Sequence, residues 1–205
     1  MVMTMVKTLK LEQLASLSIG VVFKRYKVDA SIKVHTYKLL TLKSFSAQGW
    51  IDESNLEVLY TKKPIHDKYL TKPGDVIIRL SKPFTAIAIT KETSGIVVPS
   101  LFIRISDISN SLQPDYLMFL LNSQKYHDAF LKVHVGPTFP VLQLRTVKTI
   151  NIPVVEEEKQ ALIAQLNNDW IEEKKLETAL QEQYEAFRKV TGNQFVEVGD
   201  VYDSE

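Results

Sequence analysis

The sequence predicts an α+β protein: a compact, mixed α/β domain with a mainly antiparallel sheet, followed by one long C-terminal helix that pairs as a coiled coil. Two observations predict it. Short runs rich in Ile and Val are separated by turn residues in the first part of the chain, and an apolar stripe at helical spacing follows in a charged segment. We expect the domain to span residues 1–154, the helix 155–191, and a flexible acidic tail 192–205.

The charges divide at nearly the same place. Residues 1–150 hold 20 Lys and Arg against 11 Asp and Glu, a net charge of +9, whereas residues 151–205 hold 5 against 13, a net charge of −8. A basic body favours a polyanionic ligand, and an acidic helix favours a protein partner. The alternative is that the basic side chains are scattered over the body and the helix is a solvated acidic surface.

The N-terminal part predicts short elements. Leucines three residues apart in residues 11–17 favour a short helix or turn, which Gly20 ends. Residues 21–43 are rich in Val, Ile, Thr and Tyr around a basic cluster, which predicts short strands and a loop.

The middle of the chain predicts a sheet. Lys72-Pro73-Gly74-Asp75 is a turn signal, because Pro fixes one dihedral angle and Gly accepts the left-handed one. Pro99 is expected to break or bulge the last of the strands that follow. The Ile- and Val-rich runs predict an antiparallel meander at 75–80, 84–90 and 95–105.

Helices are expected next. Pro114 suits a first helical turn, and the apolar spacing after it predicts one helix that ends within 133–136. A second short helix over 142–150 and an extended segment at 151–155 follow.

The long helix is expected to begin at Glu156 or Glu157 and to end near Val190, with Gly192 as a stop signal. An exposed apolar stripe on so long a helix predicts a partner helix, although it could instead pack on its own domain. The stripe consists of Leu162, Leu166, Trp170, Leu176, Leu180, Tyr184 and Phe187.

Composition excludes several classes of function. Without cysteine, the chain forms no disulfides, thiolate metal sites or Cys nucleophiles. No signal peptide or membrane-spanning run is visible, so we expect a cytoplasmic protein without membrane contact. Phosphate-binding glycine loops, dinucleotide fingerprints and paired metal ligands are missing, which predicts a protein that is not an enzyme.

Four fragments resemble the specificity subunits of type I restriction-modification systems, in the order and spacing of that family. The resemblance covers about residues 8–190, with two departures: Val155 stands where a second proline is common, and Lys159 separates Glu158 from Gln160. The fragments are Lys72-Pro73-Gly74-Asp75-Val76-Ile77-Ile78, Asp115-Tyr116-Leu117-Met118-Phe119-Leu120-Leu121 with Ser123, Gly136-Pro137-Thr138 with Leu142 and Leu144, and Asn151-Ile152-Pro153-Val154 with Glu158-Lys159-Gln160 and Ile163.

The resemblance implies a half-length subunit with one target-recognition domain and one conserved spacer helix. Such a subunit reads one half of a bipartite site on double-stranded DNA. Through the helix it pairs with a second copy or with another half subunit, and it docks methyltransferase subunits; a translocase-nuclease subunit can join. It implies no cofactor on this chain, because S-adenosylmethionine is bound by the methyltransferase subunit.

Basic and polar residues are the candidates for DNA contact, because phosphates attract cations and polar tips read base edges. Arg79 is a candidate for the guanine edge, or else a partner for a carboxylate such as Asp75. The candidates are Lys24, Arg25, Lys27, Lys62, Lys63, Arg79, Lys82, Lys132, His134 and Thr138.

Two other functions stay open at this point. A silent specificity fragment would dimerise through its helix without reading DNA. A compact nuclease would need a clustered metal-binding carboxylate site, which the sequence does not display.

Overall fold

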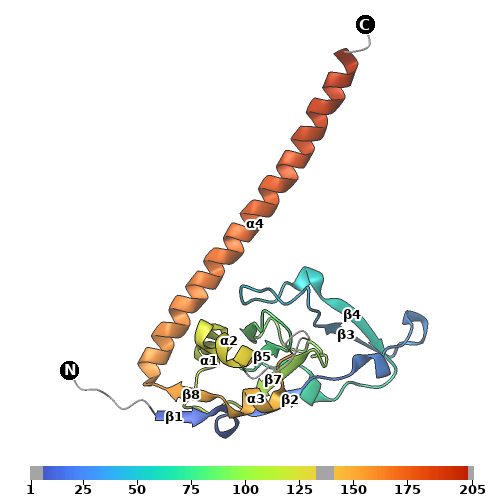
Figure 1. Ribbon diagram of the computed structural model, residues 1–205. Coiled ribbons are helices and arrows are strands. Elements are labelled where there is room, and N and C mark those ends of the chain that lie inside the picture. Colours follow the sequence, from blue (N-terminus) through green and yellow to red (C-terminus); the bar gives the residue numbers. More distant parts are fainter. Residues whose placement is uncertain (1–6, 133–140, 203–205) are drawn as a thin grey trace, which may run out of the picture. The chain divides into compact units, whose positions relative to one another are not determined.

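The computed structural model describes residues 7–132 and 141–202, with side chains described as far as residue 191. The chain divides into two compact units, Met1–Asn167 and Asn168–Glu205. The first is a mixed α/β body with antiparallel sheets, and the second consists of the later part of the long helix α4 (Glu157–Tyr202) and the residues after it (Figure 1). The predicted α+β class with a long C-terminal helix is confirmed.

The central sheet has four antiparallel strands in the order β2-β7-β5-β6. All residues of β7 are buried, so this sheet lies at the centre of the core. The predicted antiparallel pairing is confirmed, but the meander order is wrong, because β7 pairs with β5 and not with β6. The strands are β2 (Ser16–Ile19), β5 (Val76–Arg79), β6 (Ala86–Ala88) and β7 (Phe102–Ser106).

The helix α1 (Pro114–Asn122) covers the edge of β6 that no strand of the central sheet occupies. At the end of α1, the Asn122 side-chain amide takes the place of a strand. The Ala86 N–H donates to Asn122 Oδ1 at 2.7 Å, and Asn122 Nδ2 donates to the Ala86 carbonyl at 2.9 Å. Both backbone groups of this buried edge residue are therefore satisfied.

The helix expected from Pro114 to 133–136 is in fact two helices, α1 and α2 (Gln124–Lys132). The prediction of one helix is wrong, because Ser123 between them has an extended backbone, with ψ at 151°. The Ser123 hydroxyl donates to the Leu120 carbonyl and so satisfies a terminal group of α1. The short helix expected within 142–150 is confirmed as α3 (Leu144–Thr149).

The two ends of the body pair with each other. β1 (Lys7–Lys10) lies antiparallel to β8 (Asn151–Val154), the segment expected to be extended. A 3-10 turn, Leu11–Gln13, follows β1. The short helix or turn expected over residues 11–17 is thus reduced to these three residues, because the chain enters β2 at Ser16.

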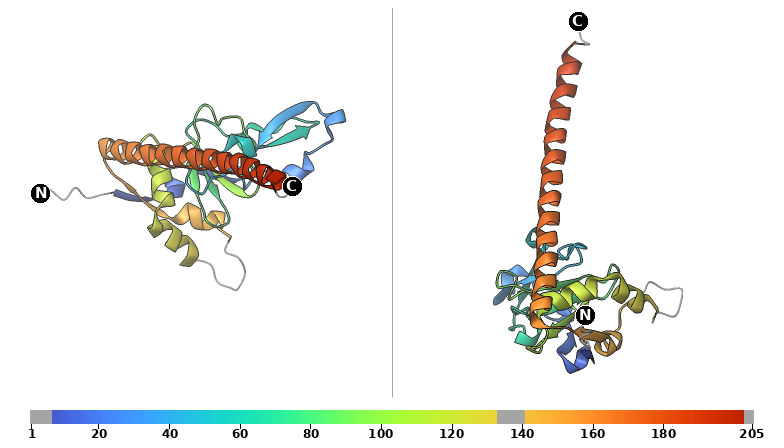
Figure 2. Two further views of the ribbon diagram at one scale, coloured as in Figure 1. Left: turned by 90° about the horizontal axis from the view of Figure 1, so that it is seen from above. Right: turned by 90° about the vertical axis from the view of Figure 1, so that its left-hand side faces the viewer.

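A separate two-stranded ribbon consists of β3 (His35–Leu39) and β4 (Glu57–Thr61). It lies at the opposite end of the body from α1 and α2 (Figures 1 and 2). Its connection, residues 40–56, packs back into the central core. Phe45 from this connection packs against Phe102 of β7, with ring centroids 4.9 Å apart.

The buried amide of Gln160 fixes the first turn of α4. Gln160 is 2% exposed, and its Nε2 donates to the carbonyls of Ser111 and Val155 at 2.9 and 2.8 Å. Its Oε1 accepts from the Gln113 N–H at 2.9 Å. One side chain thus satisfies three backbone groups.

The predicted start of α4 is confirmed, but the stop expected near Gly192 is wrong. The helix continues through Gly192 to Tyr202. A glycine within a helix costs about 1 kcal/mol, a penalty too small to end a helix by itself. None of the helices in residues 7–132 and 141–202 is long and apolar enough to cross a membrane.

Candidate nucleic-acid interface

The β3–β4 ribbon has an inner and an outer face, because side chains alternate along both strands. On the inner face, Leu39 and Leu59 are buried in a small core with Val21, Ile65 and Val97. Outward-facing residues form two cross-strand pairs, in which Thr36 lies opposite Tyr60 and Lys38 opposite Val58. Thr36, Lys38 and Val58 are exposed, and Tyr60 is half-buried. We call these four residues the outer face of the ribbon.

Five predicted DNA-contacting residues gather at one end of the ribbon. Lys24 and Arg25 lie in a 3-10 turn, Phe23–Arg25, and Lys27 then forms an antiparallel bridge with Thr61, the last residue of β4. Thr61 leads directly into two further lysines. The fold therefore unites two segments that are far apart in the sequence. We call this set the basic cluster: Lys24, Arg25, Lys27, Lys62 and Lys63.

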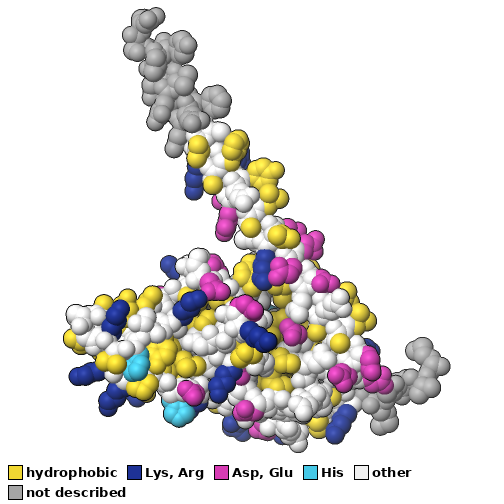
Figure 3. Space-filling model, turned by 180° about the vertical axis from the view of Figure 1, so that it is seen from behind, with side chains coloured by type: hydrophobic (Ala, Val, Ile, Leu, Met, Phe, Trp, Pro, Cys, Tyr) yellow, Lys and Arg dark blue, Asp and Glu magenta, His cyan; other side chains and the backbone are white. Residues whose placement is uncertain are grey.

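The basic cluster is exposed and its charge is not neutralised locally. All five side chains are exposed, and none forms an ion pair with the residues that the structure describes. Residues 21–72, which contain the ribbon, hold 10 Lys and Arg against 5 Asp and Glu, a net charge of +5. Figure 3 shows Lys and Arg side chains gathered over this part of the body. Such a surface attracts a polyanion.

Sequence reasoning missed Lys33 and Lys38 as members of this surface. Lys33 Nζ lies 4.5 Å from the centre of the Tyr60 ring, which places a cation on an aromatic face. Lys38 forms an exposed ion pair with Glu53 at 2.7 Å. Residues 33–39 show no regular alternation of polar and apolar residues, so the sequence did not indicate which of them are exposed.

Three other candidates lie elsewhere in the body. Arg79 ends β5 in the central sheet, Lys82 is exposed in the loop after it, and Lys132 is the exposed last residue of α2. His134 and Thr138 lie outside the described residues. The structure therefore does not place these candidates on the ribbon.

Arg79 is half-buried, and its Nε donates to the Ser81 hydroxyl at 2.9 Å. Burial lowers the pKa of its guanidinium group from the ordinary value. The alternative that Arg79 pairs with Asp75 is wrong, because Asp75 has a different partner.

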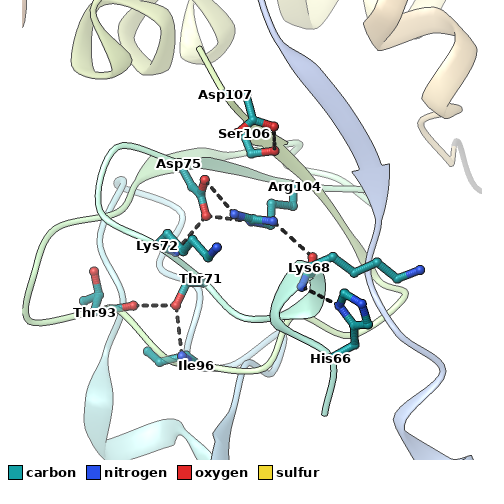
Figure 4. Close-up of polar contacts among 10 residues, drawn as sticks. All are labelled: His66, Lys68, Thr71, Lys72, Asp75, Thr93, Ile96, Arg104, Ser106 and Asp107. Carbon is teal, nitrogen blue, oxygen red and sulfur yellow. Dashed lines mark hydrogen bonds and ion pairs between the residues drawn. The ribbon is translucent and has the colours of Figure 1, made fainter.

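That partner is Arg104 of β7, in a buried ion pair within the body (Figure 4). Arg104 Nε and Nη2 donate to the two Asp75 carboxylate oxygens at 2.6 and 3.0 Å. The carboxylate also accepts the Lys72 N–H at 2.7 Å, and Arg104 Nη1 donates to the Lys68 carbonyl at 3.1 Å. These contacts fix the Pro-Gly-Asp turn to the sheet, so Asp75 has a structural role.

The apolar stripe of α4 is exposed in the single chain, as predicted. Seven side chains with exposed fractions between 46% and 70% form it. They are Leu162, Leu166, Trp170, Leu176, Leu180, Tyr184 and Phe187. Within the described residues, no group of three or more His, Asp or Glu could hold a metal ion.

Residues 7–186 match a family model described as the type I restriction modification DNA specificity domain. The sequence matches none of the curated proteins.

Three solved structures share the fold of this chain. The HsdS subunit from Thermoanaerobacter tengcongensis has a TM-score of 0.61 at 12% identity, over 90% of this chain and 46% of that one. A chain from a study of assembly and conformational transition in the type I R-M system has a TM-score of 0.59 at 15% identity. The match covers 89% of this chain and 42% of that one. The type I restriction-modification S subunit from M. genitalium has a TM-score of 0.51 at 12% identity. The match covers 84% of this chain and 41% of that one. This chain thus spans less than half the length of each.

Proposed function

Because the chain belongs to the type I restriction modification DNA specificity family, we propose that it is a DNA-recognition subunit that reads one half of a bipartite site. The basic cluster at the end of the ribbon is the observation that supports DNA binding. Its five cations are exposed and free of ion pairs with described residues, so they can replace the counterions of several neighbouring phosphates.

In this proposal, the basic cluster contacts phosphates and fixes the position of the body on the duplex. Arg79 reads a guanine edge, to which a guanidinium group can donate two hydrogen bonds. Lys82, Lys132, His134 and Thr138 supply further contacts to the backbone. The reaction chemistry belongs to other subunits: methyltransferase subunits modify the site, and a translocase-nuclease subunit cleaves.

In this proposal, the long helix α4 joins two copies of the chain. An exposed stripe of seven apolar side chains fits a second copy of itself in an antiparallel pair, because the same surface then serves both partners. Asp169 and Glu173 interrupt the stripe and would fix its register at a cost in stability. The paired helices offer the docking surface for the methyltransferase subunits, and the working unit is a cytoplasmic homodimer.

A methylation map of the source cell's genome, with and without this gene, tests the proposal. We expect a two-part methylated word to disappear on deletion, and a palindromic word would indicate a homodimer. An unchanged map, with the methyltransferase partner expressed, would refute the reading function. In vitro, the affinity for duplex DNA should fall steeply with salt concentration.

Helix pairing has its own test. Leu166→Glu with Leu180→Glu places charges within the stripe and should convert a dimer into a monomer in sedimentation experiments. Ala179→Glu with Ala186→Glu adds the same two charges at exposed residues outside the stripe; it is the control and should leave the dimer intact. A wild-type chain that is monomeric at high concentration would exclude the homodimer.

A silent assembly fragment is the second candidate, and the exposed stripe by itself favours it. Such a fragment would dimerise normally but would bind DNA without sequence preference or fail to bind it. Dimerisation together with an unchanged methylation map would select this function.

A further inference from the structure

The geometry points to the outer face of the β3–β4 ribbon as a base-reading surface of the chain, additional to Arg79, and this face enters the major groove of double-stranded DNA. This inference rests on the proposed DNA-recognition function and deepens it. It assigns base reading to Thr36, Lys38, Val58 and Tyr60, none of which the sequence had indicated.

The shape of the ribbon fits the groove. The major groove of B-DNA is about 12 Å wide and admits a two-stranded β-ribbon, whereas the minor groove, about 6 Å wide, does not. β3 and β4 form a sheet of two strands, each five residues long, and a small core supports the inner face. The outer face is therefore both exposed and held in place.

The chemistry of the outer face fits base edges. Thr36 offers a hydroxyl and a methyl group, and Val58 offers methyl groups for contact with thymine. Lys38 can donate to guanine O6 and N7. Its present partner, Glu53, is about half exposed, as Lys38 is, and such an exposed ion pair is readily exchanged for a base.

Charge fixes the direction of entry. The basic cluster lies at the end of the ribbon where Lys27 bridges Thr61, and Lys33 lies over Tyr60 near the same end. Asp52, Glu53 and Glu57 lie at the opposite end. Phosphates are attracted to the first end and repelled from the second, so the cluster holds one DNA strand while the outer face lies along the bases.

The experiment selects DNA sequences from a random duplex library with the full chain. It distinguishes base reading by the outer face from phosphate contact by the basic cluster. Thr36→Val and Val58→Thr exchange a hydroxyl and a methyl group while preserving shape and β-branching. Ile19→Thr, which introduces a hydroxyl at an exposed residue of β2 outside the ribbon, is the control. Lys62→Ser with Lys63→Ser tests the anchor, and thermal unfolding verifies that each variant is folded.

We expect the two ribbon variants to change the selected base at one or two positions of the word. Discrimination there should fall by about tenfold or more, with an unchanged salt dependence. The anchor variant should keep the word but weaken binding to every sequence. Its slope of log affinity against log salt should be smaller by about 0.9 for each lost phosphate contact.

If the wild-type chain selects a word and both folded ribbon variants select the same word at the same affinity, the inference is wrong and the proposed function stands. Ribbon variants that weaken binding to all sequences equally would also overturn it, because they would then act as anchors. A wild-type chain that selects no word would refute the proposed function and this inference together.

Discussion

In the central sheet, the guanidinium group of Arg104 is bound to both oxygens of Asp75 and is withdrawn from solvent, whereas at the end of the ribbon Arg25 lies exposed without an ion pair among the described residues. The same side chain thus serves two purposes. In the sheet its charge is used to hold the fold together, and at the ribbon it remains available to a ligand. The difference teaches that net charge becomes informative about binding only after the internally paired cations are identified.

The largest expected loss of stability follows from breaking the buried ion pair between Arg104 and Asp75. Arg104→Met leaves the Asp75 carboxylate buried without its partner, and should lower the free energy of unfolding by about 3–5 kcal/mol. Urea denaturation measures this. The double variant Arg104→Met with Asp75→Asn should lose less than the single one, because no unpaired charge remains. A loss below about 1 kcal/mol for Arg104→Met would contradict the structural role.

The amide that covers the edge of β6 should have the next largest effect. Asn122→Ala leaves the N–H and the carbonyl of Ala86 without their partner, and we expect a loss of about 2 kcal/mol in the same measurement. Asn110→Ala makes the same change at an exposed residue and should alter stability by less than about 0.5 kcal/mol. Equal losses for the two variants would show that the edge needs no cover.

Alkaline pH should destabilise the body through a buried tyrosine, Tyr126. Burial raises the pKa of Tyr126 to about 12, and its hydroxyl donates to the Asn151 carbonyl at 2.7 Å. The unfolded chain loses this proton near its ordinary pKa of about 10. The contribution of Tyr126 to stability should therefore be constant below pH 10 and be lost as pH rises toward 12. Tyr126→Phe should flatten the resulting fall in stability; an equally steep fall in the variant would exclude Tyr126 as its cause.

The smallest effect on stability is expected at the ribbon. Arg25→Met makes the same substitution as Arg104→Met, but should change the free energy of unfolding by less than about 0.5 kcal/mol. Its DNA affinity should fall, and the slope of log affinity against log salt should decrease by about 0.9. A large loss of stability would mean that the exposed cluster is structural, and the comparison would then fail.

Local signals explain what the sequence predicted well. Pro114 marks the start of α1, the Pro-Gly-Asp turn precedes β5, and the helical spacing of apolar residues in α4 identifies a stripe that is in fact exposed. Each signal lies within a few residues of the element that it predicts. The predicted members of the basic cluster came from charge density alone, without knowledge that the two segments meet.

Long-range pairing explains what was missed. The outer edge of the central sheet is bonded by Asn122, whose side chain reaches Ala86 from 36 residues away. Asp75 and Arg104 are 29 residues apart, and nothing in either segment identifies the other as its partner. The interruption between α1 and α2 at Ser123 is not marked by a glycine or a proline in the sequence. The outer face of the ribbon also requires the register of β3 against β4, which no local pattern gives.

The connection between β3 and β4 passes through the core of the central sheet, where Phe45 packs against Phe102. The ribbon is therefore already ordered before any ligand arrives. Binding to the selected word should then show a negative heat-capacity change that matches the surface buried at the interface, without the larger change that accompanies folding on binding. Calorimetry over a range of temperatures would thus distinguish a ribbon that docks as a rigid element from one that the DNA must first assemble.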